Sequence, residues 1–337
     1  MTTNGRRHAV SRRSQGFAVG VDGTPLYYRM NGPLGGRTDA SGAATEGGEA
    51  RTAVCFSDGI GCEGYVWKYL EAALAGAPEN EVETPRPIIH WHYRGHGKTP
   101  LPRDPERITV SDCADDLVAV LDAAGDNAAA QLRAASDEPR PFERVVLAGH
   151  SMGVQVCLEA WRRHPERVAG LVLVCGAYGT PLRTFKNSRA LEDLLPIARL
   201  AVHAMPRAVS AFFRAALPTD LAYKLATTFE VNGELVRPED FKPYLEHMAC
   251  VDPRLFVDML AAAGRHTARE ILPSIDVPTL IIAGDRDGFT PLSLSEEMHA
   301  LIPNSVLHIV KSGSHTAPIE KPDEVNAAVT AFLRDLD

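Results

Sequence analysis

The sequence lacks several features that would assign it to a specialised class. No stretch approaches the about 18 apolar residues that a membrane-spanning helix needs, so we expect no membrane span. Cysteine is sparse and forms no C-x-x-C pair, so we expect free thiols in a reducing compartment, the cytoplasm, rather than a disulfide framework. The six cysteines are Cys55, Cys62, Cys113, Cys157, Cys175 and Cys250.

A basic excess is also missing. The 337 residues carry a formal net charge of -8, whereas a general nucleic-acid binder needs a basic surface to displace counterions from phosphates. With 45% hydrophobic and 23% charged residues, the composition is that of a soluble globular protein. We therefore expect a small molecule as partner, and no nucleic acid; the oligomeric state is not indicated by the sequence.

The N-terminal segment contains Arg12 and Arg13 in a pattern that loosely resembles a twin-arginine export signal. Such a signal continues into an apolar run, but here the polar residues 22–25 follow shortly afterwards. We therefore expect no export and interpret residues 1–16 as a disordered tail.

Short apolar runs alternate with amphipathic segments along most of the chain. The runs are continuous in hydrophobicity, which is typical of strands buried on both faces of a parallel sheet. After a hairpin predicted around residues 17–30, they fall at 53–56, 87–89, 145–148, 171–174, 279–282 and 306–310. Helices are predicted between them at 65–74, 110–123, 152–163, 292–301 and 322–333. This order indicates an α/β fold with a doubly wound sheet.

The alternation is interrupted between residues 178 and 264. Every periodic segment there has a helical pattern, at 190–205, 208–216, 221–228 and 254–263. We interpret residues 178–264 as an all-helical cap inserted between two halves of one core, 17–177 and 265–337. Two Ala- and Gly-rich stretches, 32–51 and 125–141, are interpreted as loops.

The most informative motif is Gly149-His150-Ser151-Met152-Gly153, directly after one predicted strand and before a predicted helix. So tight a turn strains the serine backbone and needs neighbours without side chains, so that the strand and the helix can approach. It also exposes the Ser151 hydroxyl and places the Met152 N–H at a helix start, where negative charge is favoured. Ser151 is therefore the candidate nucleophile; the alternative is a serine that only caps the helix.

A serine nucleophile needs a base, usually a histidine that a carboxylate orients. His315 lies in a Gly-containing loop between the last predicted strand and the last predicted helix, where such sheets hold reactive groups. Asp285 and Asp287 both follow the strand at 279–282, and the residues alone leave both open as the acid.

The order Ser, Asp, His, the nucleophile turn and the inserted helices together resemble the α/β-hydrolase fold. The resemblance is to its lid-bearing branch of serine hydrolases, which includes esterases, lipases, C–C bond hydrolases and cofactor-free haloperoxidases. It implies an eight-stranded, mostly parallel sheet with helices on both faces. The family's G-x-x-D pattern selects Asp287 over Asp285, and Asp58-Gly59-Ile60 matches its oxyanion loop. By that match the N–H groups of Ile60 and Met152 form the oxyanion hole.

Two departures from the family pattern occur together. The family has His where this chain has Asp58, and Asp where this chain has His92. We hypothesise that the two side chains meet at adjacent strand ends, which preserves one carboxylate–imidazole hydrogen bond. A third departure is Val154, where a second glycine is common; we expect it to affect only how helix and strand pack.

A metal site is the alternative interpretation of the neighbouring histidines. His90, His92 and His96 superficially resemble the H-x-H-x-D-H motif of metallo-β-lactamase-like hydrolases, but the Asp is missing and the spacing differs. We expect neither a metal nor an organic cofactor. Cys62 and Glu63 are interpreted as packing or entrance residues, because no base for a cysteine nucleophile is evident.

The resemblance implies hydrolysis of a carboxylic ester through an acyl-enzyme. His150, Gly149, Gly153 and Gly59 would support the reacting groups. The alternatives are a C–C bond hydrolase or haloperoxidase-like enzyme with the same triad, and a non-catalytic receptor for a small ligand. We expect an apolar substrate, since apolar cap residues could line its pocket: Leu194, Leu195, Leu200, Val202, Met205, Phe212, Phe213 and Leu217. Arg183, Lys186 and Arg189 could bind an anion, although a solvated helix face is favoured.

Overall fold

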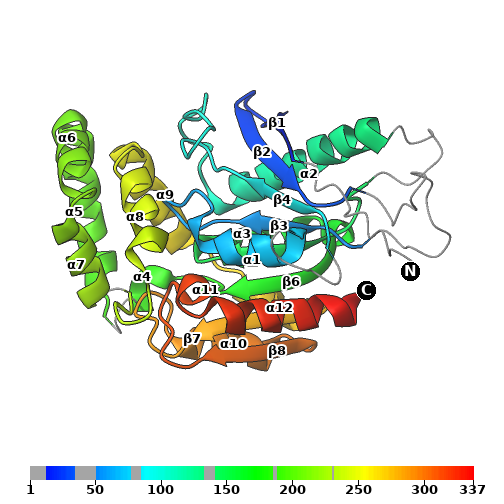
Figure 1. Cartoon of the computed structure of the whole chain (residues 1–337). Helices are drawn as coiled ribbons and strands as arrows, with labels where there is room; N and C mark the ends of the chain where they lie inside the picture. Colours follow the sequence, from blue (N-terminus) through cyan, green and yellow to red (C-terminus); the bar gives the residue numbers. More distant parts are fainter. Residues whose placement is uncertain (1–12, 35–50, 77–84, 133–140, 185–187, 230) are drawn as a thin grey trace, which may run out of the picture.

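The computed structural model describes residues 13–34, 51–76, 85–132, 141–184, 188–229 and 231–337. Its core is an eight-stranded sheet in the order β1-β2-β4-β3-β5-β6-β7-β8, in which the pairs β1–β2 and β2–β4 are antiparallel and the other neighbours are parallel (Figure 1). The strands are β1 (Ser14–Val19), β2 (Pro25–Asn31), β3 (Val54–Ser57), β4 (Ile88–Trp91), β5 (Val145–His150), β6 (Val168–Val174), β7 (Thr279–Gly284) and β8 (Ser305–Val310). The predicted α/β fold class, with a mostly parallel sheet, is confirmed.

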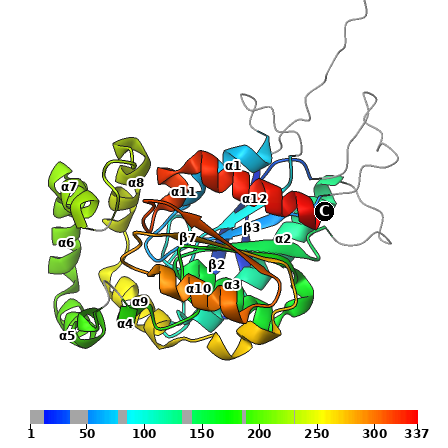
Figure 2. The same ribbon diagram turned by 90° about the horizontal axis from the view of Figure 1, so that it is seen from below.

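Helices cover both faces of this sheet, as Figure 2 shows from below. One face carries α2 (Val110–Leu132), α3 (Met152–Arg163) and α10 (Leu292–Leu301). The other carries α1 (Lys68–Ala75) and α12 (Pro322–Leu336), preceded by the short α11 (Ala317–Glu320). Short 3₁₀ helices lie at η1 (Tyr65–Trp67), η2 (Pro165–Arg167) and η4 (Arg269–Ser274).

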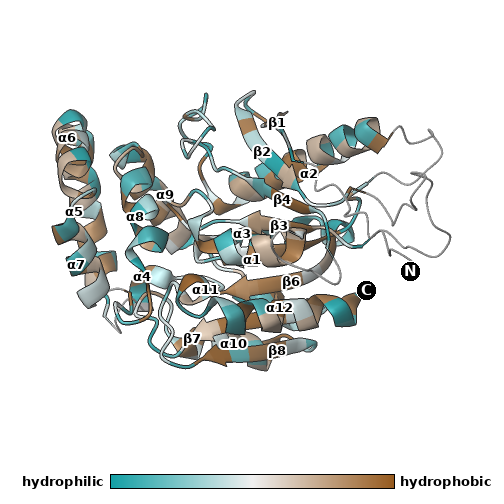
Figure 3. Ribbon diagram, viewed as in Figure 1, coloured by the Kyte–Doolittle hydropathy of each residue, from teal (hydrophilic) through white to brown (hydrophobic). Residues whose placement is uncertain are grey.

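The strand sequences are continuously apolar because helices bury both faces of the sheet. Cys55 of β3 packs into the cluster that contains α2 and α3, whereas its neighbours Val54 and Phe56 pack into the cluster that contains α1 and α12. Successive strand residues face opposite sides, so a strand that is covered twice needs apolar residues at every position. Figure 3 shows this as hydrophobic colour on the central strands.

Between β6 and β7 the described residues add no strand to the sheet. They form α4 (Pro181–Thr184), α5 (Ala190–Ala204), α6 (Pro206–Ala216), α7 (Asp220–Phe229), α8 (Pro238–Met248) and α9 (Pro253–Arg265). We call this segment, residues 178–264, the helical insertion; Figure 1 shows α5 to α8 at one side of the core. It has a small apolar cluster of its own around Leu195 and Val202, and it shares a second cluster, around Phe241 and Leu245, with Ile319 of the core.

Three expectations about local structure need correction. The predicted tail 1–16 extends too far, because β1 begins at Ser14 and pairs with β2; residues 1–12 lie outside the described part. The predicted loop 125–141 is wrong up to Leu132, because α2 continues through its alanines, which favour helix, and buries Ala128. Residues 133–140, and 35–50 of the other predicted loop, are outside the described residues.

The helix α8 is the third correction, since no helix was predicted there. It begins with Pro238 and contains Pro243, and both prolines mask the helical pattern although the first turn tolerates proline. In the described residues, no helix combines the length and apolarity that crossing a bilayer requires.

Candidate active site

Ser151 lies between β5 and α3 in a strained backbone conformation. Its φ of 56° and ψ of -118° fall outside the regions that residues with a side chain usually adopt. The two glycines around it allow a very close approach of the backbone. A Cβ on Gly149 would lie 2.3 Å from the Gly153 carbonyl oxygen, and one on Gly153 would lie 2.2 Å from that of Ser57. The turn therefore has the geometry that the sequence motif predicts.

Val154, where the family commonly has a second glycine, is fully buried at the start of α3. The space that it needs comes from Gly176, which follows β6: a Cβ there would lie 2.3 Å from Val154 Cγ2. The departure thus changes packing, as expected, and the glycine is supplied by the neighbouring chain segment.

Ser151, His315 and Asp287 form a continuous hydrogen-bonded chain. Ser151 Oγ and His315 Nε2 are 2.9 Å apart, and His315 Nδ1 and Asp287 Oδ2 are also 2.9 Å apart. A carboxylate can only accept, so Nδ1 of His315 donates to Asp287, and in the neutral ring this leaves the lone pair of Nε2 for the serine hydroxyl proton. The structure places Asp287 against His315, whereas Asp285 is exposed.

Asp287 is held in place by the first turn of the segment that follows it. Its Oδ1 accepts hydrogen bonds from the N–H groups of Phe289 and Thr290 at 2.8 Å and 2.9 Å, and its Oδ2 accepts from the Thr290 hydroxyl at 2.8 Å. The carboxylate is buried, and the Phe289 ring lies 4.9 Å from the His315 ring. These contacts fix the orientation of the carboxylate; Thr290 and Phe289 were not predicted from the sequence.

The predicted oxyanion loop lies against Ser151. A Cβ on Gly59 would lie 3.0 Å from Ser151 Cβ, so a larger residue there would have to push the loop and the serine slightly apart. Among the described residues, neither the Ile60 N–H nor the Met152 N–H finds a hydrogen-bond acceptor within the protein. Both amides are thus free to bind an external oxygen, which is the property that an oxyanion hole requires.

His96 holds this loop by a hydrogen bond to Gly61, a role that the sequence did not indicate. Its Nδ1 donates to the Arg94 carbonyl oxygen at 3.0 Å, and its Nε2 accepts the N–H of Gly61 at 3.0 Å. The second bond requires a neutral ring. Burial lowers the pKa of His96 to about 4, which keeps the ring neutral near pH 7.

The hypothesised hydrogen bond between Asp58 and His92 is wrong. Asp58 Oδ2 instead accepts from His90 Nε2 at 2.8 Å, while His92 Nδ1 accepts the N–H of Lys98. The β3–β4 register pairs Phe56 with His90, so a straight extension would bring Asp58 beside His92. However, β3 ends at Ser57, and the carboxylate reaches the earlier histidine.

Burial disfavours the charged forms of both Asp58 and His92. Burial raises the pKa of Asp58, but the contact with His90 and the other nearby imidazoles outweighs it, so the net direction is downward. The pKa of His92 is lowered to about 3, chiefly by burial. A carboxylate–imidazole bond next to the oxyanion loop therefore exists, with His90 as the partner.

His150, the residue before the nucleophile, contacts the base directly. Its Nε2–H donates to the His315 carbonyl oxygen at 2.8 Å, and the side chain is buried. Burial lowers its pKa to about 4, so the ring is neutral near pH 7. This contact ties the nucleophile turn to the loop that carries the base.

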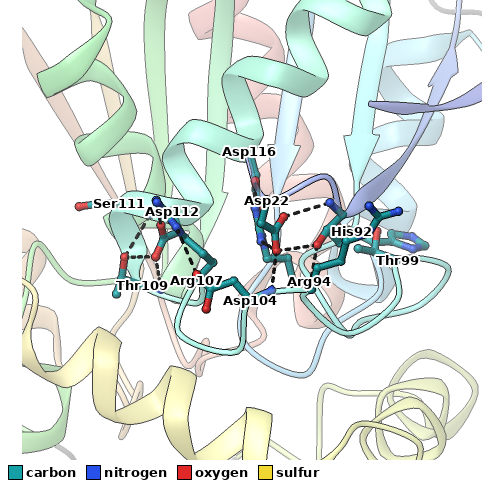
Figure 4. Close-up of polar contacts among 12 residues, drawn as sticks. Asp22, His92, Arg94, Thr99, Asp104, Arg107, Thr109, Ser111, Asp112 and Asp116 are labelled. Atoms are coloured by element: carbon teal, nitrogen blue, oxygen red, sulfur yellow. Dashed lines mark hydrogen bonds and ion pairs between the residues drawn. The ribbon is translucent and has the colours of Figure 1, made fainter. Parts of the chain in front are cut away.

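Arg94 anchors the turn that contains His96. Figure 4 shows its guanidinium between Asp22 and Asp116. It makes two hydrogen bonds to Asp116, at 2.6 Å and 2.7 Å, and an ion pair with Asp22 at 2.7 Å. Burial lowers the pKa of Arg94, but the two carboxylates raise it more, so the side chain stays charged. The buried ion pairs join the β1–β2 hairpin, the turn after β4 and α2.

The metal alternative finds no ligand set in the described part of the chain, where no three His, Cys, Asp or Glu side chains are grouped to hold an ion. His90 and His96, two of its three histidines, are engaged as described above. Cys62 is buried beside the oxyanion loop, and burial raises its pKa well above the ordinary value, which makes it a poor nucleophile.

The helical insertion contacts the oxyanion loop through α8. Glu63 forms an ion pair with His247 at 2.9 Å, and a Cβ on Gly61 would lie 2.2 Å from Met248 Sδ. Two cavities, of about 390 Å³ and 480 Å³, both have Glu63, Pro243 and His247 in their walls. Glu63 thus lines both cavities; neither of them has Ser151 or His315 in its walls.

The apolar residues of the insertion do not gather as expected. Leu195 and Val202 are buried in the insertion itself, and Phe213 and Leu217 are half-buried. Four others are between 59% and 73% exposed, so they do not line a closed pocket: Leu194, Leu200, Met205 and Phe212. Arg183 and Arg189 both pair with Glu192, while Lys186 lies outside the described residues.

Comparison with known proteins identifies the family. The sequence profile of the alpha/beta hydrolase family matches residues 54–328, and the chain belongs to this family. RutD of Caulobacter vibrioides, whose name gives it a provisional assignment as a carbamate hydrolase, is 28% identical over 93% of this chain and 96% of its own length. A pimeloyl-[acyl-carrier protein] methyl ester esterase of Neisseria meningitidis is 30% identical over 62% of this chain and 73% of its own length.

Solved structures show the same fold. A thermophilic esterase from Thermogutta terrifontis matches with a TM-score of 0.65 and 18% identity, covering 96% of this chain and 99% of its own. A bromoperoxidase from Bacillus anthracis matches with a TM-score of 0.67 and 22% identity, covering 96% and 100%. The protein is therefore a hydrolase of this family, and ester-cleaving enzymes recur among its relatives.

Proposed function

We propose that this protein hydrolyses carboxylic esters through an acyl-enzyme formed on Ser151. The observation that carries the proposal is the unbroken chain from Asp287 through His315 to Ser151, with both links at 2.9 Å. The free amides of Ile60 and Met152 beside the hydroxyl support it. The methyl ester esterase among the relatives supports an ester as the substrate.

In the first half of the proposed reaction, the Ser151 oxygen attacks the ester carbonyl carbon while His315 Nε2 takes the hydroxyl proton. The carbonyl oxygen becomes an oxyanion that accepts from the amides of Ile60 and Met152, and losing one such donor typically costs about 3 kcal/mol of barrier. The intermediate collapses by breaking the bond to the alcohol oxygen, which takes the proton from His315 and leaves as the alcohol.

In the second half, water attacks the acyl carbon as His315 takes a proton from it. The tetrahedral intermediate then expels the Ser151 oxygen, which recovers that proton, and the carboxylic acid leaves. Asp287 holds the Nδ1–H tautomer throughout and stabilises the imidazolium that forms in each half. Water is the only co-reactant, so the proposed cycle requires neither a metal nor an organic cofactor.

The substrate that we propose is a small, largely apolar ester, with the helical insertion as a cap at the carboxyl end of the sheet. The contacts of Met248 and His247 with the oxyanion loop support this placement. We also propose that the reaction takes place in the cytoplasm, because all six cysteines are free thiols.

The test is hydrolysis of nitrophenyl esters of increasing acyl length by the wild-type protein and by Ser151→Ala. We expect kcat to fall by about 10⁴-fold or more when the nucleophile is removed, because the remaining groups have no hydroxyl to activate. Ser293→Ala is the matched control, since Ser293 lies exposed on α10. Full activity of Ser151→Ala would contradict the proposal.

The same variants separate the alternatives. Turnover of vinylogous diketones, or formation of peracids, in preference to esters would indicate a C–C bond hydrolase or a haloperoxidase-like enzyme with the same triad. If a fluorophosphonate does not label Ser151, a non-catalytic receptor is favoured instead. Loss of activity with a chelator, together with an active Ser151→Ala variant, would revive the metal interpretation.

A further inference from the structure

Glu320 is a buried carboxylate that the proposed reaction does not use. It is the last residue of α11 and is only 6% exposed. Burying a carboxylate is costly unless hydrogen bonds replace its water. Glu320 accepts from the Ser314 N–H at 2.6 Å, from the Thr316 hydroxyl at 2.9 Å and, most closely, from the Ser314 hydroxyl. So complete a set of donors indicates a specific role.

The donors share one property, which is their position beside the base. Ser314 and Thr316 directly precede and follow His315. The Glu320 carboxylate therefore binds the loop on both sides of the imidazole. The carbonyl oxygen of His315 is held separately by His150. The backbone of His315 is thus fixed from two directions, independently of the bond between its ring and Asp287.

A third contact reaches the same loop from the helical insertion. The N–H of Asn232 donates to Glu320 Oε1 at 3.1 Å, and its side-chain amide donates to the Ser312 carbonyl oxygen at 2.8 Å. Ser312 has a φ of 59°, in the left-handed region that is unfavourable for a residue with a side chain. Asn232 therefore helps to hold a strained point of the loop and links the loop to the insertion.

From this geometry we infer that Glu320 is a positioning residue, which holds His315 within hydrogen-bond reach of both Ser151 and Asp287 by acting through Ser314 and Thr316. Asn232 supports the same loop through its own hydrogen bonds to Glu320 and Ser312. The inference deepens the proposed function and rests on it. It assigns to the chain a second carboxylate, distinct from Asp287, on which the activity of the base depends.

Glu320→Gln is the sharpest variant because it keeps the shape of the side chain. The amide nitrogen that replaces one oxygen is a donor, and it must face either the N–H of Ser314 or the N–H of Asn232, so one backbone N–H loses its acceptor in either orientation. The loop has to shift, and a displacement of about 1 Å at a reacting group can lower the rate by about 100-fold. We therefore expect kcat to fall by about 10- to 100-fold, with KM changing by less than about threefold.

The experiment measures the rate constant and the final stoichiometry of Ser151 labelling by a fluorophosphonate, together with kcat and KM for a nitrophenyl ester. A positioning role predicts slow labelling of Glu320→Gln that still reaches one label per chain. A merely structural role predicts incomplete labelling at the wild-type rate, because only the folded fraction reacts. Of the bonds that hold this loop, Asn232→Ala removes only the side-chain bond to Ser312, and Glu320 still holds Ser314 and Thr316. It should therefore slow labelling less, by about three- to tenfold.

Glu324→Gln is the matched control, since Glu324 lies one turn further along on α12 and pairs with His308 instead of the loop. It should label at the wild-type rate. Labelling of Glu320→Gln at the wild-type rate would overturn the inference, whether or not labelling is complete. If Glu320→Gln does not fold, Thr316→Val replaces it, since it keeps the shape of the side chain but removes the hydroxyl that donates to Glu320, and wild-type labelling of Thr316→Val then overturns the inference. If the wild-type protein is not labelled at all, the proposed function fails, and the inference falls with it.

Discussion

Asp58 is a buried carboxylate whose compensation depends on one imidazole. Its Oδ2 bonds to His90, and its Oδ1 has no partner among the described residues. Removing one member of a buried pair leaves an unpaired charge, which costs about 3–5 kcal/mol of stability. Which of two neighbouring histidines is replaced should therefore matter, although both are buried.

We predict that His90→Ala lowers the free energy of unfolding by about 2 kcal/mol more than His92→Ala, because only the first leaves Asp58 uncompensated. His92→Ala is the matched control, as it removes an imidazole of equal size and frees only the N–H of Lys98. Urea unfolding at pH 7.5 measures both. Equal losses would show that the bond between His90 and Asp58 does not stabilise the fold.

The residues of the proposed triad could be predicted from the sequence, because each lies in a short motif that follows a predicted strand. Ser151, His315 and Asp287 follow three different strands, and each motif lies next to a recognisable strand. The partner of Asp58 could not be predicted, because His90 on β4 and His92 just after it are two residues apart, and the sequence does not show where β3 ends. The role of Glu320 was equally hidden, since it depends on a fold-back of α11 towards the His315 loop.

The nucleophile turn depends on how closely α3 approaches β3. At Gly153 the obstacle to a side chain is the Ser57 carbonyl oxygen, a backbone atom that cannot rotate away. At Gly264 on α9 the obstacle is the Leu182 side chain, with Cδ1 at 2.2 Å and Cγ at 2.8 Å, and not a backbone atom. The two helical glycines thus differ in what they touch.

We predict that Gly153→Ala destabilises the protein by more than about 2 kcal/mol and slows Ser151 labelling, because α3 must move away from β3. Gly264→Ala should destabilise the protein less than Gly153→Ala does, since alanine gains helix propensity and a side chain can shift where a backbone carbonyl cannot. Thermal unfolding and fluorophosphonate labelling test both. A Gly153→Ala variant as stable as the wild type would contradict the close packing described for this turn.

At the scale of elements, apolar periodicity predicted the strands and most helices. It failed in two helices whose local sequence is not typical of an amphipathic helix. The prolines of α8 concealed a helix that packs on the core through residues such as Phe241, and the alanines at the end of α2 resembled a loop because they lack large apolar side chains. Tertiary burial decided both cases.

Across the whole molecule, buried neutral histidines couple stability to pH. Burial lowers the pKa to about 3 for His92 and to about 4 for His96 and His150, from an ordinary value of 6.5. Below pH 6.5 the unfolded chain takes up protons that the folded chain refuses until about pH 4. The folded state therefore loses stability as the pH falls through this window.

We predict that acidification from pH 7 to pH 5 lowers the free energy of unfolding by on the order of 1–2 kcal/mol for each of these imidazoles. In His96→Asn the loss of free energy of unfolding between pH 7 and pH 5 should be smaller by the contribution of one imidazole, because asparagine does not titrate. The measurement is urea unfolding at both pH values, which compares slopes rather than absolute stabilities. An unchanged slope in His96→Asn would show that His96 is not held neutral by the fold.

The helical insertion also affects how the protein is made. The outer edge of β6 pairs with β7, and Val174 and Thr279 are separated in the chain by the whole insertion. At typical rates of synthesis, a nascent chain presents that apolar strand edge without its partner for on the order of ten seconds. During this interval β6 is a template for pairing with other chains. The insertion, whose Met248 lies against Gly61 in the finished molecule, therefore delays completion of the sheet on the ribosome, where a chaperone would be most useful.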